Sequence, residues 1–182
     1  MERNLSMIAL FAALIAVLTL VPQIHLPFGV PITAQGLGIM LCGTVLGAKR
    51  GALAVLLYLA VAAMGLPILS GGRGGLAPFF GPSAGFLIGF PVAAFVIGWI
   101  VERWRAGIGT VAFVASVFGA IPVLYAFGIT GLVLFATKET SFATATAAMA
   151  VFLPGDILKA VLAAAITRSL ARARPQAILS RA

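Results

Sequence analysis

Long apolar segments separated by short polar or glycine- and proline-containing stretches dominate the pattern of this chain. The first apolar segment runs without a break from Leu5 to Pro22. Further apolar segments cover approximately residues 33–48, 51–66, 83–101, 108–135 and 154–171. Because about 20 apolar residues in a helix cross the hydrocarbon core of a bilayer, the pattern predicts an all-α integral membrane protein, a bundle of six transmembrane helices.

Some parts of the chain fit this pattern less simply. Segments 33–48 and 51–66 are short for membrane spans. Pro122 lies inside segment 108–135 and predicts a kink or an early end of that helix. Residues 137–141 have the composition of a loop, and Phe142–Val151 fits either an interfacial helix or part of a span. No hydrophilic stretch is long enough for a second domain, so we expect residues 1–182 to form a single transmembrane domain.

Composition excludes a water-soluble fold. Hydrophobic residues make up 62% of the chain and charged residues 9%, with a mean hydropathy of +1.18. In soluble domains, hydrophobic residues make up about 45–50% and charged residues about 25%. The single cysteine, Cys42, offers neither a disulfide framework nor a cysteine metal site. The net charge of +8 would otherwise suggest a nucleic-acid partner. In so apolar a chain, basic residues report membrane topology instead, and we expect no nucleic-acid binding.

The basic residues predict the orientation in the membrane. With six spans and a cytoplasmic N-terminus, both termini are cytoplasmic, and only Arg73 and Lys138 lie in outer loops, with Lys159 at the outer start of the last helix. This orientation agrees with the preference of basic residues for cytoplasmic connections. The residues on the inner side are Arg3, Lys49, Arg50, Arg103, Arg105, Arg168, Arg172, Arg174 and Arg181.

Asp156 and Lys159 are the most informative polar residues. Pro154 suits the first turn of a helix, where a missing N–H has no partner to lose. The spacing of i to i+3 places the carboxylate and the ammonium on one helix face. Ionisable side chains near membrane depth are costly and usually face a partner, a cavity or a ligand. One interpretation is a helix-start aspartate ion-paired with the lysine; the other is a ligand site near the outer surface.

Small residues recur along two spans. Gly81, Gly85, Gly89 and Ala93 follow one another at intervals of four, which favours close helix packing. In the first span, the pairs Ala9/Ala13 and Ala12/Ala16 have the same spacing and fit either plain packing or contact with another subunit.

The loop Ser70–Gly75 holds Arg73 among four glycines, so its backbone can approach a ligand closely and its guanidinium suits a carboxylate or a phosphate. A flexible loop with a solvated arginine is the simpler interpretation. The chain contains no Walker motif, no H-E-x-x-H and no G-x-S-x-G. The sequence therefore gives no support to an enzyme, and we expect no cofactor.

Three segments resemble the BioY family, the biotin-binding S components of energy-coupling-factor (ECF) transporters. They are residues 30–35 (VPITAQ), residues 71–75 (GGRGG) with 80–90 (FGPSAGFLIGF), and residues 152–159 (FLPGDILK). The resemblance covers essentially the whole chain. The second segment departs from the family pattern Gly-Pro-Thr-Gly-Gly-Tyr at Ser83, Ala84 and Phe86, and Phe86 cannot donate a phenolic hydrogen bond.

The resemblance implies that this single domain captures biotin with high affinity near the extracellular face of the cytoplasmic (inner) membrane, as a multi-pass vitamin-uptake protein. It also implies partners in the bilayer, namely a transmembrane coupling subunit driven by two cytoplasmic ATPases. An alanine-spaced motif in the first helix docks the coupling subunit in this family, and Ala9, Ala13, Ala12 and Ala16 match it in kind. Some similar proteins are thought to work without these partners.

The chemistry of biotin agrees with this implication. Asp156 can accept from the ureido N–H groups and Lys159 can donate to the ureido carbonyl, while Arg73 is the best external cation for the valerate carboxylate. Gln35 can add an amide contact, and Phe86 lies in the matching motif. We expect loops 23–32 and 67–80 to close over the ligand as a lid.

Two alternatives remain open at the level of sequence. An S component for riboflavin or thiamine should place aromatic side chains near the outer loops, but Trp99 and Trp104 lie near the cytoplasmic end of the fourth span. An ion-coupled transporter often shows inverted repeats and broken helices at the bilayer midplane. We find no internal repeat, and Asp156 is not at the midplane.

Overall fold

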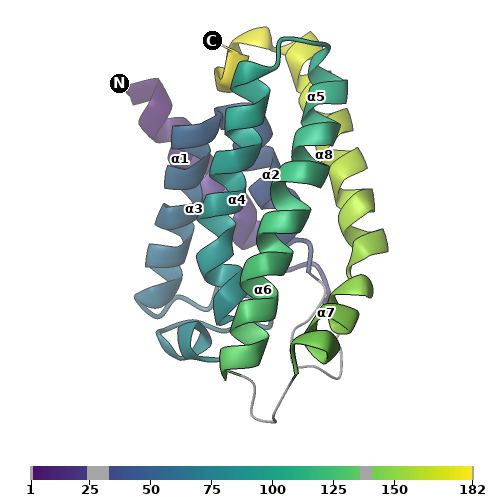
Figure 1. Cartoon of the computed structure of the whole chain (residues 1–182). Helices are drawn as coiled ribbons and strands as arrows, with labels where there is room; N and C mark the ends of the chain where they lie inside the picture. Colours follow the sequence, from purple (N-terminus) through teal and green to yellow (C-terminus); the bar gives the residue numbers. More distant parts are fainter. Residues whose placement is uncertain (1, 24–32, 136–140, 182) are drawn as a thin grey trace.

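The computed structural model describes residues 2–23, 33–135 and 141–181, and Figure 1 shows their helices packed side by side as a bundle. The all-α class is confirmed within these residues. The helices are α1 Glu2–Leu18, α2 Gln35–Leu41, α3 Ala48–Ala63, α4 Ala84–Arg103, α5 Ile108–Ala115, α6 Ile121–Phe135, α7 Phe142–Ala150 and α8 Leu153–Ala173.

Two wider π-helical turns continue the shorter helices. Cys42–Leu46 (η1) extends α2, and Ser116–Ala120 (η3) joins α5 to α6. Pro122 therefore does not end the fifth predicted segment, which is one helical run from Ile108 to Phe135. A proline cannot donate the backbone hydrogen bond of a regular helix, and the π-helical turn just before Pro122 changes the hydrogen-bond spacing at that point.

Length and hydropathy identify fewer spans than the sequence pattern predicts. Among the described residues, α4 and the run 108–135 are long and apolar enough to cross a membrane. The pair α7 and α8, bent by 49°, forms a third candidate. The helices α1 and α3 have 17 and 16 residues, slightly short by this measure. Each of the six predicted segments contains a helical run, and α7 begins at Phe142, where the sequence left two interpretations open.

The central helix α4 packs against α3 on one side and α6 on the other. Gly85 makes the second contact close, because a Cβ atom there would lie 2.0 Å from the backbone oxygen of Phe127 and 2.9 Å from the Cα of Gly131. Near the other end of α4, a Cβ on Gly98 would lie 2.2 Å from the backbone nitrogen of Ala48. Glycines therefore set the spacing of the bundle on both sides of α4.

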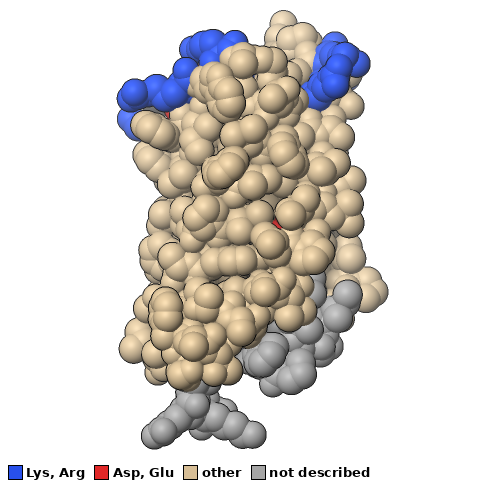
Figure 2. Space-filling model, turned by 45° about the vertical axis from the view of Figure 1, so that its right-hand side comes forward, with Lys and Arg blue, Asp and Glu red and all other residues tan. Residues whose placement is uncertain are grey.

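One end of the bundle carries most of the positive charge, and we call it the basic end. The starts of α1, α3 and α5 and the ends of α4 and α8 meet there, and both ends of the chain lie near it (Figure 1). On the face seen in Figure 2, the Lys and Arg side chains gather at this end. Its basic residues are Arg3, Lys49, Arg50, Arg103, Arg105, Arg168, Arg172, Arg174 and Arg181.

Beyond α8, residues 175–181 fold back onto the basic end as two short 3₁₀ turns, which we call the C-terminal strap. Ile178, Leu179 and Ser180 are buried. The Ser180 hydroxyl donates to the backbone oxygen of Thr44 at 2.6 Å, and the Arg50 guanidinium donates to the backbone oxygen of Leu179 at 2.7 Å. The strap thus ties the end of α8 to η1 and α3.

Candidate functional site

The first two turns of α8 hold Asp156 and Lys159 close together at the end of the bundle opposite the basic end. Pro154 lies in the first of these turns, as the sequence predicts. Lys159 Nζ donates to Asp156 Oδ1 at 2.8 Å, and the two side chains are 15% and 13% exposed. The predicted placement on one helix face is confirmed. The pair is shielded from solvent yet still accessible.

Tyr125 of α6 is a third member of this cluster, and the sequence analysis missed it. Its hydroxyl donates to Asp156 Oδ2 at 3.1 Å. Each carboxylate oxygen of Asp156 therefore has one donor already. A phenol in an apolar helix usually needs a polar partner when it is buried, which was a usable signal, but the sequence does not tell which helix supplies that partner.

Gln35 begins α2 and is 3% exposed. Its amide nitrogen donates to the hydroxyl of Tyr58, and that hydroxyl donates to the backbone oxygen of Ile68 at 3.0 Å. The chain of hydrogen bonds connects α2, α3 and the loop that follows α3. The adjacent Gly36 lies against Lys159, because a Cβ atom there would be 3.4 Å from Lys159 Cδ. The start of α2 therefore links the charged pair to the loop.

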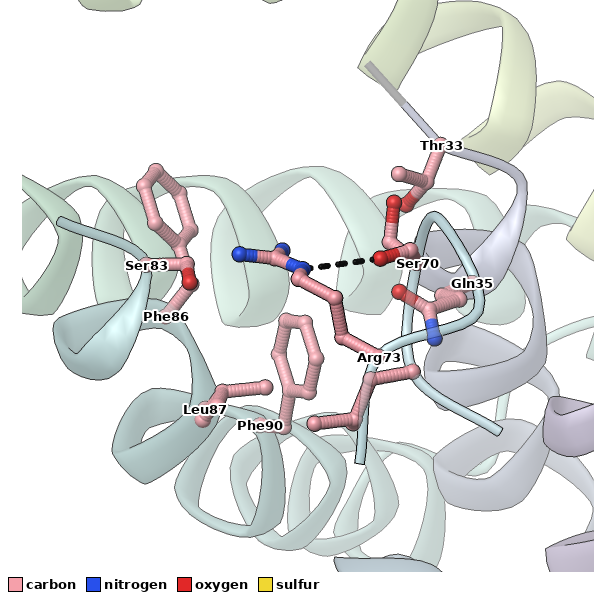
Figure 3. Close-up of a pocket in the computed structure, with 9 residues that line it drawn as sticks. Thr33, Gln35, Ser70, Arg73, Ser83, Phe86, Leu87 and Phe90 are labelled. Atoms are coloured by element: carbon pink, nitrogen blue, oxygen red, sulfur yellow. Dashed lines mark hydrogen bonds between the residues drawn. The ribbon is translucent and has the colours of Figure 1, made fainter. Parts of the chain in front are cut away.

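The loop after α3 turns sharply on its glycines and places Arg73, an exposed residue, at a pocket of the bundle. Gly71 and Gly72 have φ angles of 77° and 68°, a left-handed conformation that glycine adopts without strain. The turn brings the backbone nitrogen of Leu69 within 2.9 Å of the Arg73 oxygen. Arg73 Nε donates to the Ser70 oxygen at 2.9 Å. Figure 3 shows the guanidinium group pointing across a pocket toward Ser83 and Phe86.

Arg73, Gln35 and Phe86 line the same pocket, as the sequence analysis expects of site residues. The volume of this pocket is about 50 Å³, well below the about 300–1,000 Å³ of typical ligand pockets. The Arg73 side chain extends across this space (Figure 3). The full lining is Thr33, Gln35, Leu69, Ser70, Arg73, Ser83, Phe86, Leu87 and Phe90.

Ser83 is a second residue that the sequence analysis did not select. Its side chain is 7% exposed, and its hydroxyl has no hydrogen-bond partner within the described part of the chain. A buried hydroxyl without a partner carries a desolvation cost, so this atom is available to a ligand. The sequence held a signal, because Ser83 occupies the threonine position of the family motif and keeps the hydroxyl.

Phe86 lies between the pocket and the charged cluster. Its ring centre is 6.1 Å from that of Phe152, the residue just before α8, at an interplanar angle of 41°. The ring also covers Gly128 of α6, where a Cβ atom would clash with it. Asp156 and Lys159 do not line the pocket of Arg73. The structure thus contains two neighbouring polar groups, joined through Phe86 and the start of α2.

The two alanine pairs of α1 lie on different faces. Ala9 and Ala13 are exposed, whereas Ala12 is buried and Ala16 is partly buried in the bundle. Ala9 and Ala13 are therefore free to contact another molecule, and Ala12 packs within this one. Residues 24–32, the greater part of the first predicted lid loop, are outside the described residues.

Comparisons with known proteins relate the whole chain to one family and one solved fold. The model of the BioY family matches residues 2–176. A protein of Rhodobacter capsulatus named "Biotin transporter BioY" is 52% identical, with 100% of both chains covered. The "Probable biotin transporter BioY" of Bacillus subtilis is 40% identical over 91% of this chain and 89% of its own length. The solved structure of an "S-component for biotin from an ECF-type ABC transporter" is similar, with a TM-score of 0.82 at 34% identity, covering 94% of this chain and 92% of that one.

Proposed function

Because the chain belongs to the BioY family, a family of transporter components and not of enzymes, we propose that it captures biotin for uptake into the cell as the substrate-binding subunit of an ECF-type transporter. The full-length match to the Rhodobacter capsulatus biotin transporter carries this proposal. The solved biotin S component, similar over 94% of this chain, supports it.

In the proposed complex, the charged cluster binds the ureido ring of biotin. A carboxylate has about four acceptor positions and an ammonium has three donors. Asp156 uses two acceptor positions, one for Lys159 and one for Tyr125, and Lys159 uses one donor. The remaining positions match the ring, which presents two N–H donors and one carbonyl acceptor. Hydrogen bonds to charged groups are about twice as strong as neutral ones, so this pairing favours high affinity.

The neighbouring pocket takes the rest of the ligand. Arg73 pairs with the valerate carboxylate, the Ser83 hydroxyl or the Gln35 amide oxygen adds a polar contact, and Phe86 covers the apolar ring between the two groups. A pocket of about 50 Å³ is too small for this. The loop that carries Arg73 therefore moves outward when biotin enters and closes over it afterwards.

The membrane arrangement follows from the charges. We place residues 1–182 as a single domain with six spans in the cytoplasmic membrane, with the basic end and both termini inside, as basic residues prefer. The site then faces outward. A coupling subunit with two ATPases provides the energy for transport, and the exposed Ala9/Ala13 face of α1 is the proposed docking surface. Small residues on a helix face allow such close contact.

Calorimetric titration with biotin tests the function directly. The protein is purified in detergent from biotin-starved cells and titrated with biotin, riboflavin and thiamine. We expect tight one-to-one binding of biotin alone. Preference for riboflavin or thiamine would mean that this vitamin, and not biotin, is the substrate. Loss of cellular uptake on collapse of the proton gradient, with ATP intact, would indicate an ion-coupled transporter instead.

A further inference from the structure

A second pocket lies at the basic end, between the start of α5 and the end of α8, far along the bundle from the biotin site. Its volume is about 470 Å³. The residues that line it are Gly107, Ile108, Gly109, Thr110, Arg168, Ala171 and Arg172. Neither the proposed biotin chemistry nor the docking of α1 uses any of these residues.

Two arginines of α8 define the character of this pocket. Arg168 and Arg172 are one helical turn apart and exposed. Like charges at this spacing destabilise a helix, unless an anion lies between them. Neither guanidinium makes a hydrogen bond or an ion pair with any residue that the structure describes.

The start of α5 shapes the pocket around the first of these arginines. The aliphatic part of Arg168 packs on Gly109, where a Cβ atom would lie 3.1 Å from Arg168 Cδ. Packing of the stem restricts the positions that the guanidinium can take. The hydroxyl of Thr110 lies in the same lining and can donate to the anion as well.

Acidic side chains of the described chain do not neutralise this pair. At the basic end these are Glu2 and Glu102. Glu102 is engaged at the opposite side of α4, where its carboxylate accepts from the backbone nitrogen of Ala48 at 2.9 Å. Glu2 lies at the start of α1, a helix that packs against α2 and α3. An anion between the two guanidinium groups would therefore have to come from outside the described chain.

The surroundings indicate which kind of anion fits this pocket. Val161 of α8, seven residues or about two turns before Arg168 on the same helix face, is an exposed apolar residue of the kind that contacts lipid chains. A molecule with an acidic head and an apolar tail fits both surfaces at once. Guanidinium groups bind phosphate with two parallel hydrogen bonds, and basic pockets between membrane helices bind phosphorylated lipid head groups. We propose that the pocket between α5 and α8 binds the phosphate head group of an anionic phospholipid.

The test measures thermal stabilisation of the delipidated protein by added phosphatidylglycerol, with phosphatidylcholine as the neutral lipid. Each basic residue near an anionic lipid contributes about fivefold in affinity. We therefore expect the R168Q/R172Q variant to need about 30-fold more phosphatidylglycerol for half-maximal stabilisation. The control R174Q, which removes one charge from the same helix end outside the pocket, should resemble the unaltered protein. R172Q alone should fall between the two.

Several results would overturn this proposal. Equal losses of stabilisation by phosphatidylglycerol in R174Q and R172Q would indicate a general attraction of the lipid to positive charge, without a specific site. Equal stabilisation by phosphatidylcholine would remove the role of the phosphate charge, and equal stabilisation by inorganic phosphate alone would assign the pocket to a free anion instead of a lipid. Biotin titration of R168Q/R172Q shows independently that the variant is folded, since the biotin site lies at the other end of the bundle.

Discussion

At the scale of single residues, the ligand chemistry depends on side chains that come from different helices. Asp156 and Lys159 lie on successive turns of α8, but Tyr125 reaches Asp156 from α6. The phenol directs one carboxylate oxygen and lowers the cost of burying its charge, since buried charges are costly unless they are hydrogen-bonded. Tyr125 therefore positions the carboxylate that we propose receives the ureido ring.

We expect Tyr125→Phe to weaken biotin binding about tenfold and Asp156→Asn to weaken it by about 1–3 kcal/mol, because a buried polar partner is then lost. Titration calorimetry measures both. Thr130→Val is the control, since the Thr130 hydroxyl on the same helix bonds only to the backbone of Ala126. Unchanged affinity in Asp156→Asn would contradict the assignment of the charged cluster.

Arg73 can be tested separately from the cluster. Arg73→Ala should weaken binding of biotin by about tenfold or more, because a charge-assisted pair with the carboxylate is lost. It should have less effect on an analogue whose valerate carboxylate is replaced by a neutral amide. Competition titrations with the two ligands compare these losses. Equal losses for both would remove the carboxylate from the role of Arg73.

The sequence predicted the pairing of Asp156 with Lys159, because the spacing that brings them together is local. Three residues separate Asp156 from Lys159, so helix geometry alone pairs them. The contacts of Tyr125 and the unpartnered hydroxyl of Ser83 depend on how α4, α6 and α8 pack. Hydropathy does not tell how each helix is rotated about its own axis in that packing. Gln35 lines the pocket of Arg73, and its role in ligand binding stays a prediction; its hydrogen bond to Tyr58 is a tertiary contact that no local pattern encodes.

At the scale of elements, glycines of one sequence repeat differ in whether they contact a neighbouring helix. Gly85 lies in direct contact with α6, whereas the nearest atom to a Cβ on Gly81 would be 4.0 Å away. Both belong to one repeat in the sequence. The difference arises because Gly81 precedes α4 and lies outside the helix contact.

Gly85→Ala should therefore lower the free energy of unfolding by about 1–3 kcal/mol, the usual cost of overpacking. Gly81→Ala should change it by less than about 0.5 kcal/mol, as surface substitutions do. Thermal unfolding in detergent, followed by the fluorescence of Trp99 and Trp104, compares them. Similar melting temperatures for the two variants would mean that α4 and α6 are not tightly packed in the protein.

In the first helix, substitutions on the exposed face and on the buried face should affect docking and folding separately. Ala13→Leu should reduce co-purification with a coupling subunit about tenfold while biotin binding is retained, because Ala13 is exposed and remote from the site. Ala12→Leu should instead lower the melting temperature of the isolated protein, since Ala12 is buried. Full co-purification of Ala13→Leu would move the docking surface elsewhere.

At the scale of the whole molecule, the basic end and the candidate ligand site lie at opposite ends of the bundle. This separation predicts the outcome of labelling with a membrane-impermeant maleimide. Leu76→Cys, in the loop near the site, should react in intact cells, and Arg105→Cys, at the basic end, should react only after permeabilisation. Both positions are exposed, and the native Cys42 is fully buried, so the unaltered protein is the control. The reverse pattern would invert the proposed orientation.

The helical runs and the charged end of the bundle were predictable, because both depend only on which residues follow one another along the chain. The apolar segments gave the helical runs, and the basic residues gave one charged end. The π-helical turns at η1 and η3 and the return of the strap were not predictable, because they satisfy the packing of several helices at once. The bend of 49° between α7 and α8 is likewise a property of the assembled bundle.

The C-terminal strap has a consequence for the order in which the protein is made. Its hydrogen bonds join Ser180 to Thr44 and Leu179 to Arg50, residues separated by 136 and 129 positions. Contacts so distant in sequence form late, since the intervening chain must first be in place. Every helix from α1 to α8 leaves the ribosome before the strap does. A nascent chain can therefore have inserted helices α1 to α8 while its basic end is still unfastened, and the contacts of the strap form only after residues 178–180 have been made.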